Sequence, residues 1–333
     1  MDQADEPLSS RAEYFETLED VPVNPSAEAT LADIVRLRLT RRDLLRGALT
    51  MVALETFGVR AATGSPGSAA LPGRSIATRF GFSEIAHGVD SNHHVAPGYD
   101  AEVLIRWGDA VLAEAPAFDP QTQSAAAQRR QFGYNNDYIG YIPLPFGSGN
   151  PAHGLLCINH EYTNEEVMFP GLGRHDTAFS NASQAIVDIE MACHGGSVVE
   201  VRKTGGKWHL VTDSRYARRI SALDTPMRLS GPAAGHPRLR TVRDPTGTRV
   251  IGTINNCAGG ITPWGTYLMA EENFHGYFWS DTVDFDGKPD LTEQPEATNM
   301  KRYGVPGRWY AWGKFHDRWN IDKEPNEPNR WGW

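Results

Sequence analysis

The sequence has few cysteines, no long apolar run and no excess of positive charge. Three cysteines in 333 residues are too few for a disulfide scaffold. No run of about 18 uncharged apolar residues occurs, so no ordinary membrane-spanning helix is expected. The net charge of −9 argues against general nucleic-acid binding. It also means that an anionic substrate would need local positive charge from metal ions or arginines.

Turn-forming and aromatic residues are plentiful. The chain contains 33 glycines and 22 prolines, together with 9 Trp, 11 Tyr and 13 Phe. Short strands joined by many turns give this mixture, which favours an all-β sandwich, barrel or propeller. The length allows one large or two ordinary domains. Because no repeat of fixed length is visible, periodicity alone does not indicate a propeller.

The N-terminal segment, residues 1–75, is expected to be separate from a folded domain at 76–333. Arg41 and Arg42 precede a moderately apolar stretch and small residues, a pattern that resembles a Tat export signal. The alternative is an amphipathic surface helix with a basic start. Residues 63–74, rich in Gly, Ser, Ala and Pro, are typical of a flexible linker. Export would place the protein in the periplasm or outside the cell.

Local patterns also predict several elements of the folded part. They predict, in chain order, a strand at 101–107, a short helix at 124–130 and a strand at 186–190, where apolar residues alternate. Two runs, 196–202 and 208–211, flank a turn with two glycines and predict a β-hairpin. Residues 284–287, Asp-Phe-Asp-Gly, are expected to form a hairpin turn, because the remaining ligand positions of a calcium loop are missing.

The stretch 252–274 is expected to lie at the centre of the protein. Its first half, rich in Asn and Gly, predicts a tight polar loop over 255–263. Its second half predicts a short strand, 266–270, which ends in Glu271 and Glu272. Successive strand residues face opposite sides, so one of these glutamates points away from the buried face. The alternative is a pair of solvated carboxylates at a strand end.

A second stretch, 155–163, is another short apolar strand that ends in possible ligands. These are Cys157, Asn159, His160 and Glu161. Thiolate and carboxylate together suit iron or zinc, while carboxylate with amide oxygen suits calcium. The spacing fits no standard zinc finger. Taken alone, Cys157 would be read as a buried inert thiol, and His160 as a structural imidazole that bonds the backbone.

These two stretches and three further motifs closely resemble the PhoX-type calcium-dependent alkaline phosphatases. The further motifs are FGYNNDYIGYIPL at 132–144, SRYARRI at 214–220 and KEPNEPNRWGW at 323–333. All five occur in the family's order between residues 79 and 333. The resemblance implies a β-propeller, and an active site that holds both iron and calcium, without a serine or histidine phospho-intermediate.

The resemblance also implies roles for individual residues. Cys157 matches the family cysteine that ligates iron, and one of Glu271 and Glu272 matches a metal-bridging glutamate, with the choice open. The expected metal ligands are Cys157, Glu161, Glu271, Glu272 and Asp137. Asn135 or Asn136 would be the amide that contacts phosphate or metal.

We therefore expect an exported, metal-dependent phosphatase that hydrolyses phosphate monoesters, with calcium and ferric iron as cofactors. Its expected partners are small phosphate monoesters and the Tat export machinery. The alternatives are a non-catalytic calcium-binding propeller fragment and another propeller hydrolase such as a lactonase. Family members extend further, so the chain is expected to be about the first half of the propeller, with little activity alone and a tendency to associate. No essential disulfide between Cys193 and Cys257 is expected.

Overall fold

The computed structural model describes residues 83–89, 91–176 and 178–332. They belong to one unit of the chain, Ser83–Trp333. The export signal expected at Arg41 and Arg42, the linker at 63–74 and the boundary at residue 75 lie outside the described residues.

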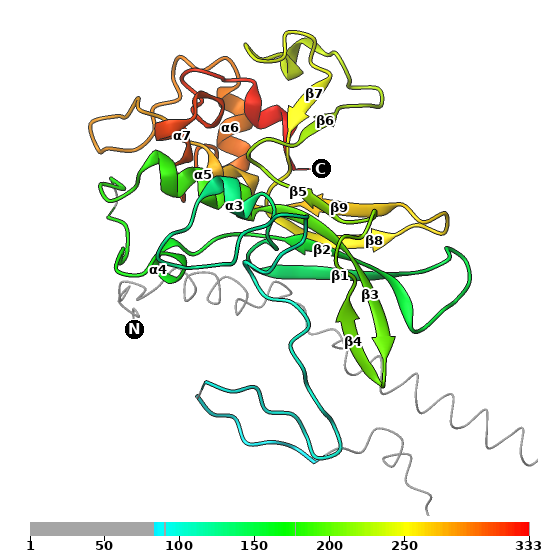
Figure 1. Ribbon diagram of the computed structural model, residues 1–333. Helices are drawn as coiled ribbons and strands as arrows, with labels where there is room; N and C mark the ends of the chain where they lie inside the picture. Colours follow the sequence, from blue (N-terminus) through cyan, green and yellow to red (C-terminus); the bar gives the residue numbers. More distant parts are fainter. Residues whose placement is uncertain (1–82, 90, 177, 333) are drawn as a thin grey trace, which may run out of the picture. The chain divides into compact units, whose positions relative to one another are not determined.

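Within the described residues, the strands form a five-stranded antiparallel sheet and two two-stranded ribbons (Figure 1). The main sheet contains β1 (Asn136–Pro143), β2 (His153–His160), β3 (Gly195–Thr204), β4 (Lys207–Leu210) and β5 (Arg218–Ile220). Its order is β1-β2-β3-β4, with β5 paired to β3. The ribbons pair β6 (Pro226–Arg228) with β7 (Arg249–Ile251), and β8 (Asn256–Ile261) with β9 (Tyr267–Glu271).

The helices are short, and most of them gather on one side of this sheet (Figure 1). They are α3 (Ala125–Gln128), α4 (Glu165–Met168), α5 (Gln184–Cys193), α6 (Ala297–Tyr303) and α7 (Trp312–Phe315). Single 3-10 turns are η2 (Pro237–Leu239), η3 (Phe274–Tyr277), η4 (Asp317–Trp319) and η5 (Glu327–Arg330). Among the described residues, no helix combines the length and apolarity needed to cross a bilayer.

The largest core cluster is aromatic. Tyr277 stacks on Tyr310 with ring centroids 4.7 Å apart, and Trp312 meets Trp319 edge-on at 5.1 Å. Val187 of α5 packs into the same cluster. Large rings bury much apolar surface at little cost in rotamer entropy, so a few of them join segments from distant parts of the sequence.

A buried polar network ties the end of β2 to this core. The Thr163 hydroxyl donates to Glu190 Oε1 of α5 at 2.8 Å, and the Trp312 indole donates to Glu190 Oε2 at 3.3 Å. The Tyr310 hydroxyl donates to the Thr163 carbonyl at 3.1 Å. A buried carboxylate is stable only when such donors meet it. The network therefore anchors the chain two residues beyond Glu161.

Several local predictions are confirmed. The hairpin predicted at 196–211 is β3–β4, with Thr204 opposite Lys207 and with Gly205 and Gly206 at positive φ, as a two-residue hairpin turn requires. The helix predicted at 124–130 is α3. At 284–287 the Asp284 carboxylate accepts the Lys288 N–H at 2.9 Å and closes a turn.

Two predicted strands are wrong. The segment 186–190 lies inside α5, because Ser183 caps the helix and Val187, Glu190 and Met191 are buried at the i, i+3, i+4 spacing of a helix face. The apparent alternation in this segment was too short to distinguish the two periods. The segment 101–107 pairs with no strand among the described residues.

The polar loop predicted at 255–263 is also wrong in most of its length. Residues 256–261 form β8, and the turn to β9 is shorter, with the Thr262 N–H donating to Thr266 O at 2.9 Å. Gly259 serves packing rather than a turn, because a Cβ there would lie 2.5 Å from the Tyr138 ring. The all-β prediction is confirmed to the extent that the described residues are mostly sheet with little helix. The same residues contain no closed sheet.

Candidate metal centre

Three side chains with metal-binding atoms meet where β1, β2 and β8 come together. One ligand atom each from Asp137, Glu161 and Cys257 lies within 4.8 Å of the others. Asp137 is exposed and the other two are half-buried, so the group is open to solvent. Asp137 belongs to β1, Glu161 follows β2 directly, and Cys257 belongs to β8.

The first part of the centre comes from the start of the β1–β2 hairpin. Asn135 precedes β1 in the left-handed conformation, with φ 48°, which asparagine tolerates better than most residues. Its carbonyl accepts the Glu161 N–H at 2.9 Å. The register then slips between Asn136 and Ile139. Such a bulge re-aims the residues that follow it, here beginning with Asp137.

The second part comes from the β8–β9 ribbon. Asn255 is also left-handed, with φ 44°, and its carbonyl accepts the Glu272 N–H at 3.0 Å. A register slip between Asn256 and Gly259 places Cys257 in a bulge. The Asn255 amide donates to Glu161 Oε1 at 3.3 Å and joins the two parts.

Negative charge is concentrated around the Cys257 thiol. Burial, a hydrogen bond with Asp137 and the charges of Glu272, Asp137 and Glu161 raise the pKa of Cys257 to about 12. Glu272 therefore lies close enough to act on the group. A bound cation would relieve this repulsion.

Glu271 and Glu272 leave β9 in different directions. The Glu271 carboxylate accepts hydrogen bonds from the Thr253 hydroxyl at 2.7 Å, the Ile254 N–H at 3.2 Å and the Gly332 N–H at 2.8 Å. Glu272 is exposed and accepts from the Asn273 amide at 2.9 Å. The alternation of strand faces thus separates a carboxylate used inside the fold from an exposed one, whose charge contributes to the raised pKa of Cys257.

Residues 80–333 match the family model described as alkaline phosphatase PhoX. The chain belongs to the PhoX family. A solved structure described as Pseudomonas fluorescens PhoX in complex with vanadate, a transition state analogue, is 42% identical with a TM-score of 0.62. The match covers 72% of this chain and 39% of that one, so this PhoX chain spans about 39% of the relative's length. A search of curated proteins found no match.

The sulfur atom in this PhoX centre is not the one expected from the sequence. Cys157 is 2% exposed, and burial raises its pKa to about 11. In the sheet it lies opposite Gly140 and Val198, and within the described residues it does not belong to the group at Asp137. All three cysteines of the chain are described, and each is a free thiol. The sequence contained a signal for Cys257, because Cys257 directly follows an Asn-Asn pair, as Asp137 does.

His160 is a structural imidazole, as expected. It is fully buried, its Nε2 accepts the Gly133 N–H at 3.2 Å, and the same atom lies 2.7 Å from Ser197 Oγ. Burial, Arg219 and His194 lower the pKa of His160 well below its ordinary value. The ring is therefore neutral at physiological pH.

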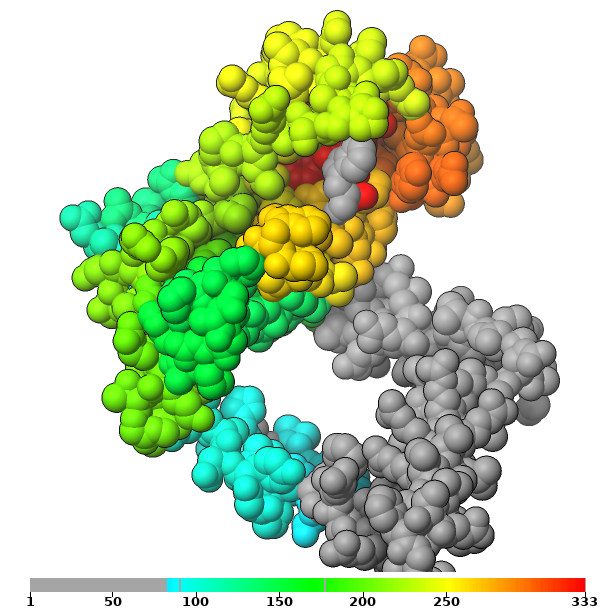
Figure 2. Space-filling model, turned by 90° about the vertical axis from the view of Figure 1, so that its right-hand side faces the viewer, coloured from blue at the N-terminus to red at the C-terminus, as the bar shows by residue number. Residues whose placement is uncertain are grey.

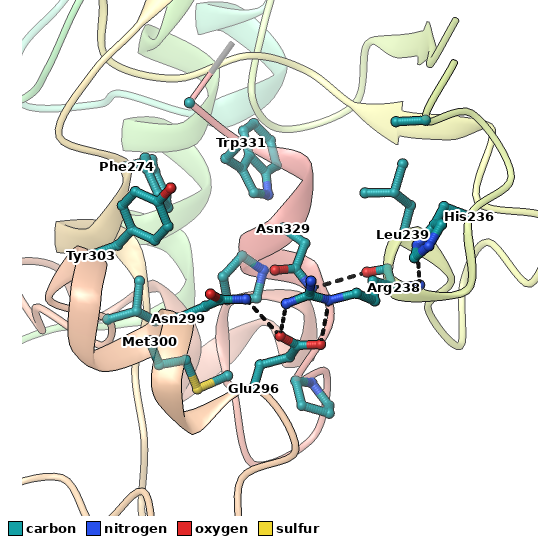
Figure 3. A pocket seen from close by; sticks show the side chains of 15 residues that line it. His236, Arg238, Leu239, Phe274, Glu296, Asn299, Met300, Tyr303, Asn329 and Trp331 are labelled. Atoms are coloured by element: carbon teal, nitrogen blue, oxygen red, sulfur yellow. Dashed lines mark hydrogen bonds and ion pairs between the residues drawn. The ribbon is translucent and has the colours of Figure 1, made fainter. Parts of the chain in front are cut away.

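A separate cleft of about 570 Å³ lies between η2, α6 and the C-terminal segment. Figure 2 shows the surface hollowed between the lime segment before β7 and the orange segment that includes α6. Across it Arg238 binds Glu296, and Phe274, Tyr303 and Trp331 form another part of the wall (Figure 3). Asp137, Glu161 and Cys257 are not among the described residues that line it, so the cleft is distinct from the candidate metal centre.

Proposed function

We propose that this chain contributes the metal centre of a phosphatase that hydrolyses phosphate monoesters. The observation that carries the proposal is the group of Asp137, Glu161 and Cys257 within 4.8 Å, with Glu272 beside it, in a member of the PhoX family. The relative was solved with vanadate, described as a transition state analogue, which supports phosphate esters as the substrate class.

The donor set fits the two proposed metals, calcium and ferric iron. Asp137, Glu161 and Glu272 supply the hard oxygen atoms that calcium requires. Cys257 supplies a sulfur atom, which suits iron and not calcium. We propose Cys257 in place of Cys157, because a thiol buried inside the main sheet does not reach the carboxylates.

The ions, when bound, would neutralise the phosphate oxygens and lower the pKa of a bound water. The protein's own residues have supporting tasks. Asn255 orients the Glu161 carboxylate through its amide. The side-chain amide of Asn135 or Asn136 is proposed to donate to a phosphate oxygen, since both residues stand next to Asp137. Their backbone already serves the centre, because the Asn135 carbonyl holds Glu161 in place.

Two broader proposals follow from the family. The short antiparallel sheets are compatible with a β-propeller, and the 42% identity to the Pseudomonas fluorescens relative supports a common fold. Arg41 and Arg42 support export by the Tat pathway to the periplasm or the medium.

Phosphate release from p-nitrophenyl phosphate tests the proposed activity. The chain is assayed with calcium and iron, alone and mixed with the part of the Pseudomonas fluorescens protein that it does not match. We expect metal-dependent release in at least one of these assays, and loss of about two orders of magnitude or more with Asp137→Asn, because the metal loses a ligand. The matched control is Glu114→Gln, a carboxylate whose side chain is 86% exposed and pairs with Arg130.

The same preparations separate the alternatives. A chain that binds calcium but releases no phosphate in either assay is a binding module, and the phosphatase proposal fails. Hydrolysis of a lactone in place of the phosphate ester would indicate a different hydrolase.

A further inference from the structure

The two hairpins that meet at the metal centre share one backbone arrangement. In each, an asparagine in the left-handed conformation precedes the first strand, with φ 48° at Asn135 and 44° at Asn255. In each, its carbonyl accepts the N–H of the glutamate that follows the second strand. These bonds are 2.9 Å from Glu161 and 3.0 Å from Glu272.

The pairing register of the strands is also the same in the two hairpins, β1–β2 and β8–β9. Asn136 lies opposite His160, and Asn256 lies opposite Glu271. Both hairpins then slip by one residue on the first strand, before Ile139 in one and before Gly259 in the other. Counting from the asparagines, Asp137 corresponds to Cys257 and Glu161 to Glu272. Each hairpin therefore offers one ligand from its bulge and one from the end of its second strand.

The residue before each glutamate, His160 or Glu271, accepts a hydrogen bond from the segment that precedes the left-handed asparagine. His160 Nε2 accepts the Gly133 N–H at 3.2 Å, two residues before Asn135. Glu271 Oε1 accepts the Thr253 hydroxyl at 2.7 Å, two residues before Asn255, and the Ile254 N–H at 3.2 Å. An acceptor at this position fixes the backbone that enters the left-handed turn.

We propose that the metal centre consists of two equivalent half-sites, with His160 and Glu271 as the positioning residues for Glu161 and Glu272. This inference rests on the proposed metal function. Neither positioning residue binds metal in this assignment, because each uses its acceptor on the segment that leads into its own hairpin, at Gly133 in one and at Thr253 in the other. The half-sites differ in their bulge ligand, a carboxylate in one and a thiol in the other, so one backbone motif provides both a hard and a soft donor.

The correspondence predicts local effects that can be measured on the full chain without metal. Glu271→Ala removes the acceptor for three donors, the Thr253 hydroxyl, the Ile254 N–H and the Gly332 N–H. We expect amide exchange at Glu272 and alkylation of Cys257 by iodoacetamide to increase about tenfold, because the backbone that enters the left-handed turn loses its hydrogen bonds to Glu271. Exchange at Glu161 should stay unchanged. His160→Ala should show the reverse, with faster exchange at Glu161 and unchanged alkylation of Cys257.

Conservative and distant variants complete the experiment. Glu271→Gln keeps an acceptor oxygen and should restore slow alkylation and most of the metal affinity that Glu271→Ala loses. Ser183→Ala removes the cap of α5 and serves as the control for general destabilisation. Metal affinity is measured with calcium and with iron on the same proteins.

The outcomes are distinct. Unchanged Cys257 alkylation in Glu271→Ala, or an equal increase in Ser183→Ala, overturns the positioning role. Faster exchange of both glutamates in both single variants overturns the separation into two half-sites. If the local effects appear but the wild-type chain binds neither metal, the half-site geometry stands and the proposed metal function fails.

Discussion

At the residue scale, the site depends on the direction in which each side chain leaves the end of its strand. Glu271 accepts the Thr253 hydroxyl and the Gly332 N–H, whereas Glu272 is exposed on the side of Cys257. The sequence could show that the two glutamates face opposite sides. It could not show which side holds the metal, because the donors to Glu271 come from residues 18 positions earlier and 61 positions later.

Glu272→Gln tests this distinction. We expect calcium affinity to fall about tenfold or more, because the charge near the metal is lost. The free energy of unfolding without metal should change by less than about 0.5 kcal/mol, as is usual for an exposed side chain. Calorimetric titration and urea unfolding measure the two effects, with Glu114→Gln as control. Equal calcium affinity in Glu272→Gln and in the wild type would remove Glu272 from the centre.

At the element scale, the sequence predicted strands well where the local pattern was strong. β2, β9 and the β3–β4 hairpin follow from apolar runs and turn residues. It failed at α5 and β8. The helix depends on burial against the aromatic core, and β8 contains two glycines that look like a turn, of which Gly259 makes room for the Tyr138 ring. Tertiary packing decided both segments.

The α5 cap gives one stability prediction. Ser183 Oγ accepts the Ile186 N–H at 3.3 Å, one of the helix N–H groups that has no partner within the helix. Ser183→Ala should lower the free energy of unfolding by about 1 kcal/mol. Urea unfolding measures it, and Ser183→Asp, which keeps an acceptor, should retain most of the stability. A loss in Ser183→Asp equal to that in Ser183→Ala would contradict the capping role.

The ion pair between η2 and α6 gives a pH-dependent prediction. Hydrogen bonding to Arg238 lowers the pKa of Glu296, so the ionised form is favoured in the folded state. The stability that it contributes is present above the ordinary glutamate pKa and is lost as the pH falls through the lower folded value. Because Arg238 is 48% exposed, Glu296→Gln should cost less than about 1 kcal/mol at pH 7.

Unfolding of the wild type and Glu296→Gln at pH 7 and in acid measures this effect. The difference between the two proteins should shrink as the pH falls. A constant difference at all pH values would mean that the loss comes from packing rather than from the charge.

At the scale of the whole molecule, buried aromatic rings connect the C-terminal segment to α5. The network of Glu190, Thr163 and Tyr310 extends from this core to the residues just after Glu161. Composition predicted many aromatics and short strands, but it could not show which rings meet. The sequence likewise could not show that the candidate metal ligands meet. Asp137 and Glu161 are 24 residues apart, and Glu161 and Cys257 are 96 residues apart.

The proposed export by the Tat pathway also belongs to the scale of the whole molecule. Replacing Arg41 and Arg42 with lysine should leave the protein in the cytoplasm, because the twin arginine is the feature by which the Tat pathway accepts a signal. Cell fractionation of the wild type and the double-lysine variant measures it. Undiminished export of the variant would contradict the Tat proposal.

The assignment of Cys257, rather than Cys157, to the metal centre is tested most directly by elemental analysis of two single variants. Wild type, Cys257→Ser and Cys157→Ser are purified with calcium and iron, and circular dichroism verifies that each is folded. We predict that Cys257→Ser loses most of the bound iron while Cys157→Ser keeps the wild-type content. Full iron content in Cys257→Ser, or its loss in Cys157→Ser alone, would contradict the centre built from Asp137, Glu161 and Cys257.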